Sequence, residues 1–213
     1  MNKKINVMLV DDHEVVRSGL RRLLEQNDGI DVVVEAESGE QAYQLYGEHL
    51  PDVVVMDMSM PGMGGLEALR RIIARYPQAR VIIFSMHENA AYASQALGVG
   101  ARAYVAKSGA ADDLVQAVRE VAAGKGYLSP GIAQQIALQT LSGSDDPTRL
   151  LSAREFEVFR LLAAGKGIEE ISTTLKISQK TVANYQTLLK QKLGISSPIE
   201  LVRLAIKHGV IEG

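Results

Sequence analysis

The sequence contains no cysteine and no tryptophan, and these absences narrow what the chain can be. Without cysteine there are no disulfides and no thiolate metal sites. No apolar run approaches the roughly 18–20 residues that a membrane-spanning helix needs. The first residues also turn acidic too early for a signal peptide. We therefore expect a globular protein without a membrane span, and its composition is compatible with the reducing cytoplasm.

Charge is divided unevenly along the 213 residues, although the formal net charge is only −2. Residues 1–146 hold 13 Lys and Arg against 19 Asp and Glu, whereas residues 147–213 hold 10 against 6. An acidic first part and a basic second part predict different partners for the two. A basic segment is a footprint of nucleic-acid contact.

Short apolar runs alternate with amphipathic helical patterns over the first 125 residues. The apolar runs are Ile5–Val10, Val32–Ala36, Val53–Asp57, Val81–Ser85 and Arg102–Ala106. The helical patterns are Val15–Gln26, Gly39–His49, Gly65–Tyr76, Ala90–Val99 and Ala110–Ala123. Strands that alternate with helices predict an α/β fold with a doubly wound, five-stranded parallel sheet over residues 1–125.

The remaining residues are interpreted as a linker and a second domain. Residues 126–147 contain one more helical pattern, Ser129–Leu141, and then the polar stretch Gly-Ser-Asp-Asp-Pro at 143–147, which is the linker candidate. Residues 148–213 are predicted to form a small all-α domain. Its helical patterns are Ala153–Ala164, Ile168–Leu175, Gln179–Leu193 and Pro198–His208.

Polar side chains stand at the carboxyl ends of four of the five expected strands. They are Asp11, Asp12, Asp57, Ser85 and Lys107. In an open parallel sheet these ends share one edge, where ligands bind. Three carboxylates repel one another unless a cation joins them, and oxygen ligands suit Mg²⁺. Each residue alone would be a helix cap, a strand end or a surface group, but together they predict a magnesium-dependent site at which an aspartate accepts a phosphoryl group.

These residues belong to a pattern that resembles a response-regulator receiver domain over about residues 4–125. The pattern also includes Val-Val-Val-Met-Asp-Met-Ser-Met-Pro-Gly-Met-Gly-Gly at 53–65 and Tyr-Val-Ala-Lys at 104–107. The resemblance implies that Asp57 accepts phosphate from a sensor histidine kinase. It further implies that Mg²⁺ is bound by Asp12, Asp57 and the Ser59 backbone carbonyl, with Asp11 acting mainly through water.

The same resemblance implies a conformational switch. Ser85 and Tyr104 match the family's switch pair, and Lys107 would hold phosphoryl oxygens together with Mg²⁺. When the phosphoryl group draws the Ser85 hydroxyl inward, the Tyr104 ring would follow into the vacated space. Such a local hydrogen-bond event would bias a surface that has two states.

Within the basic domain, Gln179–Leu193 is the candidate for nucleic-acid contact. At 100° per residue, its apolar face carries Val182, Tyr185, Leu189 and Leu193. Its opposite face carries Lys180, Ala183, Asn184, Thr187 and Gln191. Small polar side chains flanked by lysines suit a helix inserted into a DNA groove. On helical phase alone, a bundle with a solvated basic face and a protein-docking module remain as alternatives.

The wider pattern of this domain resembles the LuxR/FixJ-type DNA-binding domain over about residues 148–210. The matching stretches are Leu-Ser-Ala-Arg-Glu at 151–155, Ala-Gly-Lys-Gly at 164–167, Glu-Ile-Ser at 170–172 and Ile-Ser-Gln-Lys-Thr-Val at 177–182. The resemblance implies DNA contacts by Lys180, Thr181, Ala183, Asn184, Thr187, Lys190 and Lys192. It also implies that Glu200–His208 forms a helix through which a homodimer assembles on double-stranded DNA. Tyr185 and the stretches at 127–138 and 194–201 are similar to one branch, the GacA/UvrY-like regulators, in which the kinase is a hybrid sensor.

The sequence therefore predicts a cytoplasmic DNA-binding transcriptional response regulator rather than an enzyme. One rival is a magnesium-dependent phosphohydrolase with an aspartyl nucleophile. Such enzymes commonly have a second acid two residues after the nucleophile, where this chain has Ser59. The other rival is a phosphorylation-dependent module whose C-terminal helices bind a protein instead of DNA.

Overall fold

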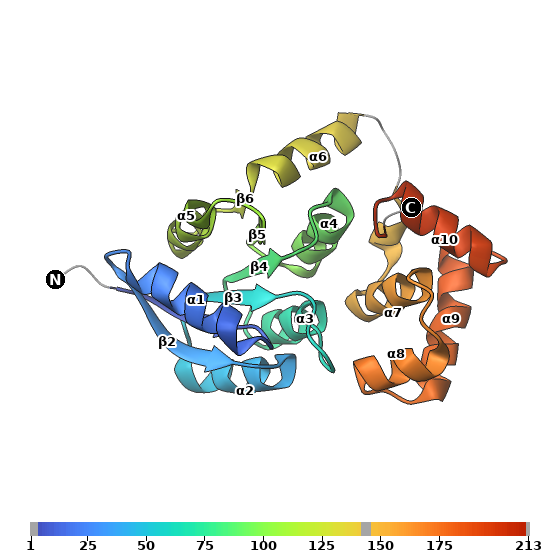
Figure 1. Cartoon of the computed structure of the whole chain (residues 1–213), viewed down its shortest axis with the longest axis horizontal. Helices are drawn as coiled ribbons and strands as arrows, with labels where there is room; N and C mark the ends of the chain where they lie inside the picture. The colour runs from blue at the N-terminus through green and yellow to red at the C-terminus, as the bar shows by residue number, and fades with distance from the viewer. Residues whose placement is uncertain (1–3, 142–145, 212–213) are drawn as a thin grey trace.

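The computed structural model describes residues 4–141 and 146–211, and a parallel sheet forms the centre of its N-terminal part (Figure 1). The sheet has six strands in the order β2-β1-β3-β4-β5-β6. They are β1 (Ile5–Val10), β2 (Ile30–Ala36), β3 (Val53–Asp57), β4 (Val81–Ser85), β5 (Ala103–Ala106) and β6 (Tyr127–Leu128). All neighbouring strands pair in parallel, as the doubly wound fold predicts.

The prediction of five strands was one short, because β6 contains only two residues. It pairs with β5 through Ala103 with Tyr127 and Tyr104 with Leu128. Two residues are too few to produce the periodicity from which a strand is inferred. The sheet thus extends into the stretch that the sequence assigns to a linker.

Helices cover both faces of the sheet. Those on one face are α1 (Glu14–Glu25) and α5 (Ala111–Ala122), and those on the other are α2 (Gly39–His49), α3 (Gly65–Arg75) and α4 (Ala90–Val99). Alternate strand residues point into the two layers: Val55 packs in the same cluster as Leu24 of α1, and Met56 in the same cluster as Leu69 of α3. Strand β3 is therefore buried along its whole length, which explains its continuous apolar run.

The rest of the described chain is helical. It comprises α6 (Pro130–Leu141), the short 3₁₀ helix η1 (Pro147–Leu150), α7 (Ala153–Ala163), α8 (Ile168–Leu175), α9 (Gln179–Leu193) and α10 (Pro198–Lys207). Ser178 caps α9 by accepting a hydrogen bond from the Thr181 N–H, and Gly194 ends it in the left-handed conformation with φ of 64°, as the sequence predicts. Most of the predicted linker at 143–147 lies outside the described residues; Asp146 within it caps η1.

The helical part packs against the sheet domain through α7, which lies beside α3 (Figure 1). The ring of Tyr92 in α4 meets the edge of Phe156 in α7, with 5.2 Å between centroids. The Tyr92 hydroxyl also donates to the Val210 carbonyl at 2.9 Å. One hydrophobic core is consequently continuous from α4 into α7. Among the described helices, none is long and apolar enough to cross a bilayer.

Candidate functional site

A buried lysine joins two aspartates at the carboxyl edge of the sheet. Lys107, directly after β5, places its Nζ 2.7 Å from Asp11 Oδ2 and 2.8 Å from Asp57 Oδ1. Asp11 follows β1 and Asp57 ends β3, so the parallel topology brings all three to one edge. The side chains are between 2% and 12% exposed, so water screens their charges little.

Burial and the neighbouring charges shift the pKa values of Asp57 and Lys107 in opposite directions. Burial raises the pKa of Asp57, although hydrogen bonding and attraction by Lys107 lower it. Burial lowers the pKa of Lys107, but Asp11 and Asp57 outweigh that effect and hold it above its usual value. Since two carboxylates share one ammonium group, and Asp12 lies beside them, the pocket has an excess of negative charge.

The excess of negative charge and the cluster of carboxylate oxygens suit a hard cation. Asp12 Oδ1 is buried and accepts no hydrogen bond among the described residues, although His13 Nδ1 lies 3.1 Å away. One ligand atom from each of Asp11, Asp12 and His13 lies within 4.8 Å of the others. The Ser59 N–H donates to Asp57 Oδ2 at 3.1 Å. This hydrogen bond keeps the loop after β3 next to the Asp57 carboxylate. Such a set of oxygen atoms fits Mg²⁺.

Ser85 and Tyr104, the expected switch pair, meet at the backbone of His87. Ser85 is buried at the end of β4, and its Oγ accepts a hydrogen bond from the His87 N–H at 3.1 Å. The Tyr104 ring is fully buried and its hydroxyl donates to the His87 carbonyl at 2.7 Å. Burial raises the pKa of Tyr104. The aromatic ring therefore already occupies the inward position.

His87 has contacts that the sequence did not predict. Its ring stacks on Tyr92 with centroids 4.0 Å apart, and its Nε2 lies 3.2 Å from Ser59 Oγ. Burial, with a smaller contribution from the charge of Arg160, lowers the pKa of His87 to about 4. The histidine thus contacts both the rim of the pocket and α4, whose Tyr92 packs against Phe156 of α7. Its position two residues after Ser85 is the only sequence signal for this role.

The positions expected to contact DNA all lie on α9. Lys180, Ala183, Asn184 and Thr187 are exposed, whereas Val182 and Leu189 are buried, as the helical phase predicts. Some of the expected contact residues, however, already use their polar side-chain groups within the chain.

Three of the expected contact residues already have partners within the chain. Thr181 Oγ1 lies 2.8 Å from Ser178 Oγ, and the Thr187 hydroxyl donates to the Ala183 carbonyl. Lys192 Nζ forms an ion pair with Glu155 at 2.7 Å. Among the predicted contacts, Lys180, Asn184 and Lys190 therefore have the polar groups that are least committed within the described residues.

Two family descriptions match the chain, one for each part. "Response regulator receiver domain" matches residues 7–119, and "Bacterial regulatory proteins, luxR family" matches residues 149–205. The first range lies in the part of the chain that forms the parallel sheet and its helices, and the second lies in the all-helical part. The first contains the lysine–aspartate pocket, and the second contains α7, α8 and α9.

Curated relatives align with nearly the whole chain. Response regulator GacA of Pseudomonas viridiflava is 40% identical over 210 residues, which are 98% of this chain and 98% of the relative. Response regulator UvrY of Escherichia coli (strain K12) is 41% identical over 208 residues, which are 97% of this chain and 95% of the relative. The order of the two parts is thus shared along the full length.

Solved structures agree with this similarity. RcsB from Salmonella enterica serovar Typhimurium, bound to promoter rprA in the presence of the phosphomimetic BeF₃⁻, is 29% identical and matches with a TM-score of 0.71 over 95% of this chain and 98% of that chain. A LuxR-family two-component response regulator from Aurantimonas sp. SI85-9A1 is 47% identical and matches with a TM-score of 0.64 over 65% of this chain and 99% of that chain.

Proposed function

Because the chain belongs to the two-component response regulators that join a receiver domain to a LuxR-type DNA-binding domain, we propose that phosphorylation of Asp57 by a histidine kinase controls its binding to promoter DNA. The supporting observation is the placement of Lys107 between Asp11 and Asp57. The proposed domains are a receiver over 1–125, a linker with a helix over 126–147 and a DNA-binding domain over 148–213.

The pocket is proposed to bind Mg²⁺ through Asp12, Asp57 and the Ser59 backbone carbonyl, with Asp11 acting mainly through water. The clustering of ligand atoms from Asp11, Asp12 and His13 within 4.8 Å of one another supports this assignment, as does Asp12 Oδ1, which accepts no hydrogen bond among the described residues. When bound, Mg²⁺ neutralises charge on the oxygens of a phosphoryl group that is being transferred.

In the proposed transfer, a carboxylate oxygen of Asp57 attacks the phosphorus of a phosphohistidine. The new O–P bond forms as the P–N bond breaks, and the imidazole leaves with the electron pair. Lys107 Nζ, 2.8 Å from Asp57 Oδ1, is close enough to bind a phosphoryl oxygen. Ser85 Oγ accepts from the His87 N–H, so its own O–H proton can be donated to a second phosphoryl oxygen.

A route from the pocket to the helical domain follows from the contacts of His87. A shift of Ser85 toward the phosphoryl group would disturb the His87 backbone, to which Tyr104 is also bonded. The His87 ring stacks on Tyr92, whose hydroxyl binds the Val210 carbonyl. We infer that phosphorylation loosens α4 from the C-terminal helices and re-poses the DNA-binding domain.

The released domain is proposed to dimerise on DNA. The contacting residues would be Lys180, Thr181, Ala183, Asn184, Thr187, Lys190 and Lys192. RcsB is a relative whose solved structures contain promoter DNA and pairs of dimers on DNA. As the LuxR/FixJ-type resemblance implies, α10 would form the dimer contact, and Ile199 and Ile206 are exposed on it.

The test is phosphate uptake from acetyl phosphate, a small phosphodonor, followed by intact-mass spectrometry. The wild-type chain should gain one acid-labile phosphoryl group in Mg²⁺ and none in EDTA, and Asp57→Asn should gain none. Asp28→Asn is the control, because Asp28 is exposed near Gly29, at the opposite edge of the sheet. Undiminished labelling of Asp57→Asn would refute the site. Continuous turnover of phosphate esters would favour the phosphohydrolase.

DNA binding is tested separately by gel retardation at low salt, with and without phosphorylation. Retardation that depends on phosphorylation is expected. Failure to retard any duplex in either state would favour the protein-docking module.

A further inference from the structure

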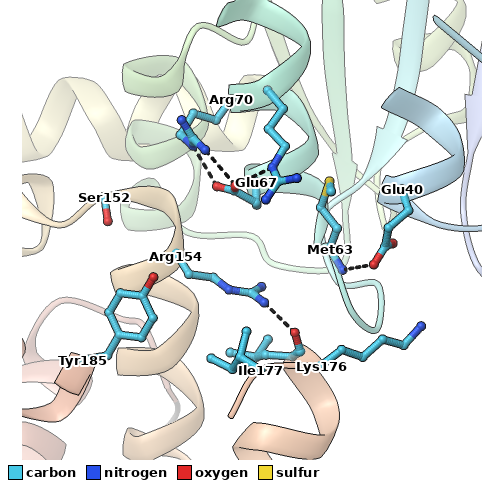
Figure 2. A pocket seen from close by; sticks show the side chains of 11 residues that line it. Glu40, Met63, Glu67, Arg70, Ser152, Arg154, Lys176, Ile177 and Tyr185 are labelled. Atoms are coloured by element: carbon cyan, nitrogen blue, oxygen red, sulfur yellow. Dashed lines mark hydrogen bonds and ion pairs between the residues drawn. The ribbon is translucent and has the colours of Figure 1, made fainter. Parts of the chain in front are cut away.

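A cavity of about 580 Å³ lies between the receiver and the helical domain, on the side of α3 (Figure 2). Arg70, Arg71 and Glu67 line it from α3. Lys176, which ends α8, and Tyr185 of α9 line it from the helical domain. The volume falls within the range of small-molecule sites in proteins. None of the residues assigned to the Asp57 pocket lines this cavity; they are Asp11, Asp12, Asp57, Ser59, Ser85 and Lys107.

The lining of the cavity carries an excess of positive charge. Four of its ionisable side chains are cationic and two are acidic; they are Arg70, Arg71, Arg154, Lys176, Glu40 and Glu67. Both oxygens of Glu67 are already bonded, to Arg70 twice and to Arg71 once, each at 2.8 Å. One Glu40 oxygen accepts from the Met63 N–H at 3.0 Å. Few acceptors are therefore left to satisfy the cationic donors.

Several donors in the cavity have no partner among the described residues. Arg70 uses Nε and Nη2 for Glu67, which leaves Nη1 free, and Arg71 uses only Nε. The Tyr185 hydroxyl makes no hydrogen bond within the described chain and points toward the side of Arg70, whereas the Lys176 ammonium group points away from Arg70 and lies near the Gly62 loop (Figure 2). Arg154 differs, because its terminal nitrogens bind the Gly62 and Leu175 carbonyls and Glu157. It contributes positive charge while holding the domains together.

We propose that this cavity binds a compact phosphate-bearing anion of the size of pyrophosphate. Guanidinium and ammonium groups with open hydrogen-bonding positions are the groups that bind phosphate oxygens in proteins. Because the donors come from both domains, the anion stabilises the packed arrangement of the two. It is a second ligand, distinct from the phosphoryl group on Asp57, and its binding does not require that the proposed phosphorylation occurs.

The test is isothermal titration calorimetry on the full chain in EDTA, with sodium pyrophosphate as the probe and constant ionic strength. Pyrophosphate should bind with one site per chain. Arg71→Gln should weaken binding about tenfold, the size expected for one lost charge-assisted hydrogen bond, and Tyr185→Phe should weaken it about fivefold, as loss of one neutral donor does. Arg119→Gln, on the exposed side of α5, removes the same charge outside the cavity and should change the affinity less than twofold.

Lys180→Gln separates this cavity from the DNA-binding face, which also attracts anions. An equal loss of affinity in Lys180→Gln would overturn the proposal, as would unchanged affinity in both cavity variants or no pyrophosphate binding at millimolar concentrations. The thermal midpoint of each variant reports folding. If Arg71→Gln does not fold, Tyr185→Phe decides alone, since it removes the hydroxyl and keeps the ring that lines the cavity. ADP that binds at least tenfold tighter than pyrophosphate identifies a nucleoside diphosphate as the ligand; equal or weaker binding identifies the inorganic anion.

Discussion

The pocket at the sheet edge and the contact between the two domains both bury charge, but they are built from different kinds of bond. In the pocket, side chain meets side chain: Lys107 binds Asp11 and Asp57. Between the domains, most hydrogen bonds end on the backbone. The Gly62 N–H donates to the Thr174 carbonyl at 2.8 Å, and Tyr92 donates to the Val210 carbonyl.

Asn89, which caps α4, and Gln95 within α4 follow the same rule. The Asn89 amide donates to the Gly209 carbonyl, and the Gln95 amide donates to the Thr148 carbonyl. Every residue has a backbone carbonyl. Such a contact can therefore form with almost any residue type at the accepting position. The pocket, in contrast, depends on the identity of each side chain. The stability of the pocket should therefore depend on its charged side chains. The packing of the two domains should instead be weakened by a side chain that is too large for the contact.

The largest effect is expected from Lys107→Ala. Removing the ammonium group leaves two buried carboxylates facing each other, and breaking a buried ion pair in this way costs about 3–5 kcal/mol. The free energy of unfolding, from urea titration, should fall by that amount. Mg²⁺ should restore part of the loss, because a ligand that binds only the folded state stabilises it.

Lys125→Ala is the matched control for the loss of Lys107. Lys125 pairs with Glu120 at 3.0 Å, but its side chain is 68% exposed. Loss of an exposed pair costs less than about 1 kcal/mol. Equal losses in the two variants would contradict the view that the pocket depends on buried charge.

The domain contact should be most sensitive at Gly64. A Cβ at this position would lie 2.1 Å from Glu157 Oε1, and Glu157 is held by Arg154 at 2.6 Å on the buried side of α7. Gly64→Ala should therefore weaken the packing of the domains by about 1–2 kcal/mol through overpacking. Small-angle X-ray scattering should show a larger radius of gyration at neutral pH.

Gly98→Ala provides the comparison for Gly64. Gly98 lies within α4, and a Cβ there meets nothing within 4 Å. The substitution should stabilise the helix by about 0.5–1 kcal/mol and leave the scattering curve unchanged. If Gly64→Ala also leaves the curve unchanged, the Glu157 carboxylate has moved aside without separating the domains.

The same contrast explains how far the sequence could predict the structure. Asp11, Asp57 and Lys107 follow apolar runs, so strand order alone brings them to one edge. The contact between the two domains had no such signal, since Gly62 in the loop before α3 and Thr174 of α8 meet through backbone atoms. The strand β6 was missed because its pairing depends on the neighbouring β5 rather than on its own two residues.

His87 connects the pocket with the domain contact, and it should make that connection sensitive to pH. Its pKa is lowered to about 4, below the ordinary value of 6.5, chiefly by burial. The unfolded chain therefore binds a proton first, and stability should fall as the pH decreases from about 6.5 to about 4. With the ring partly exposed, the expected contribution is only about 1 kcal/mol.

The measurement is urea unfolding of the wild type and of His87→Gln at pH 7 and pH 4.5. Glutamine keeps a polar group near Ser59 but does not titrate in this range. Both proteins retain Asp57, so the difference between their pH dependences isolates the histidine. Parallel pH dependences would show that His87 is not held in its neutral form by the fold.

The smallest effect on folding stability is expected on α9, whose exposed side chains are proposed to contact DNA. Asn184→Ala should lower discrimination at one base pair by about 1 kcal/mol, because an amide can bond a base edge. Lys180→Ala should instead weaken binding to every sequence and reduce the salt dependence of the affinity, as loss of a phosphate contact does. Competition binding against a panel of single-base variants separates the two outcomes. A uniform loss for Asn184→Ala would assign it to the DNA backbone, and α9 would then have to read sequence through other residues.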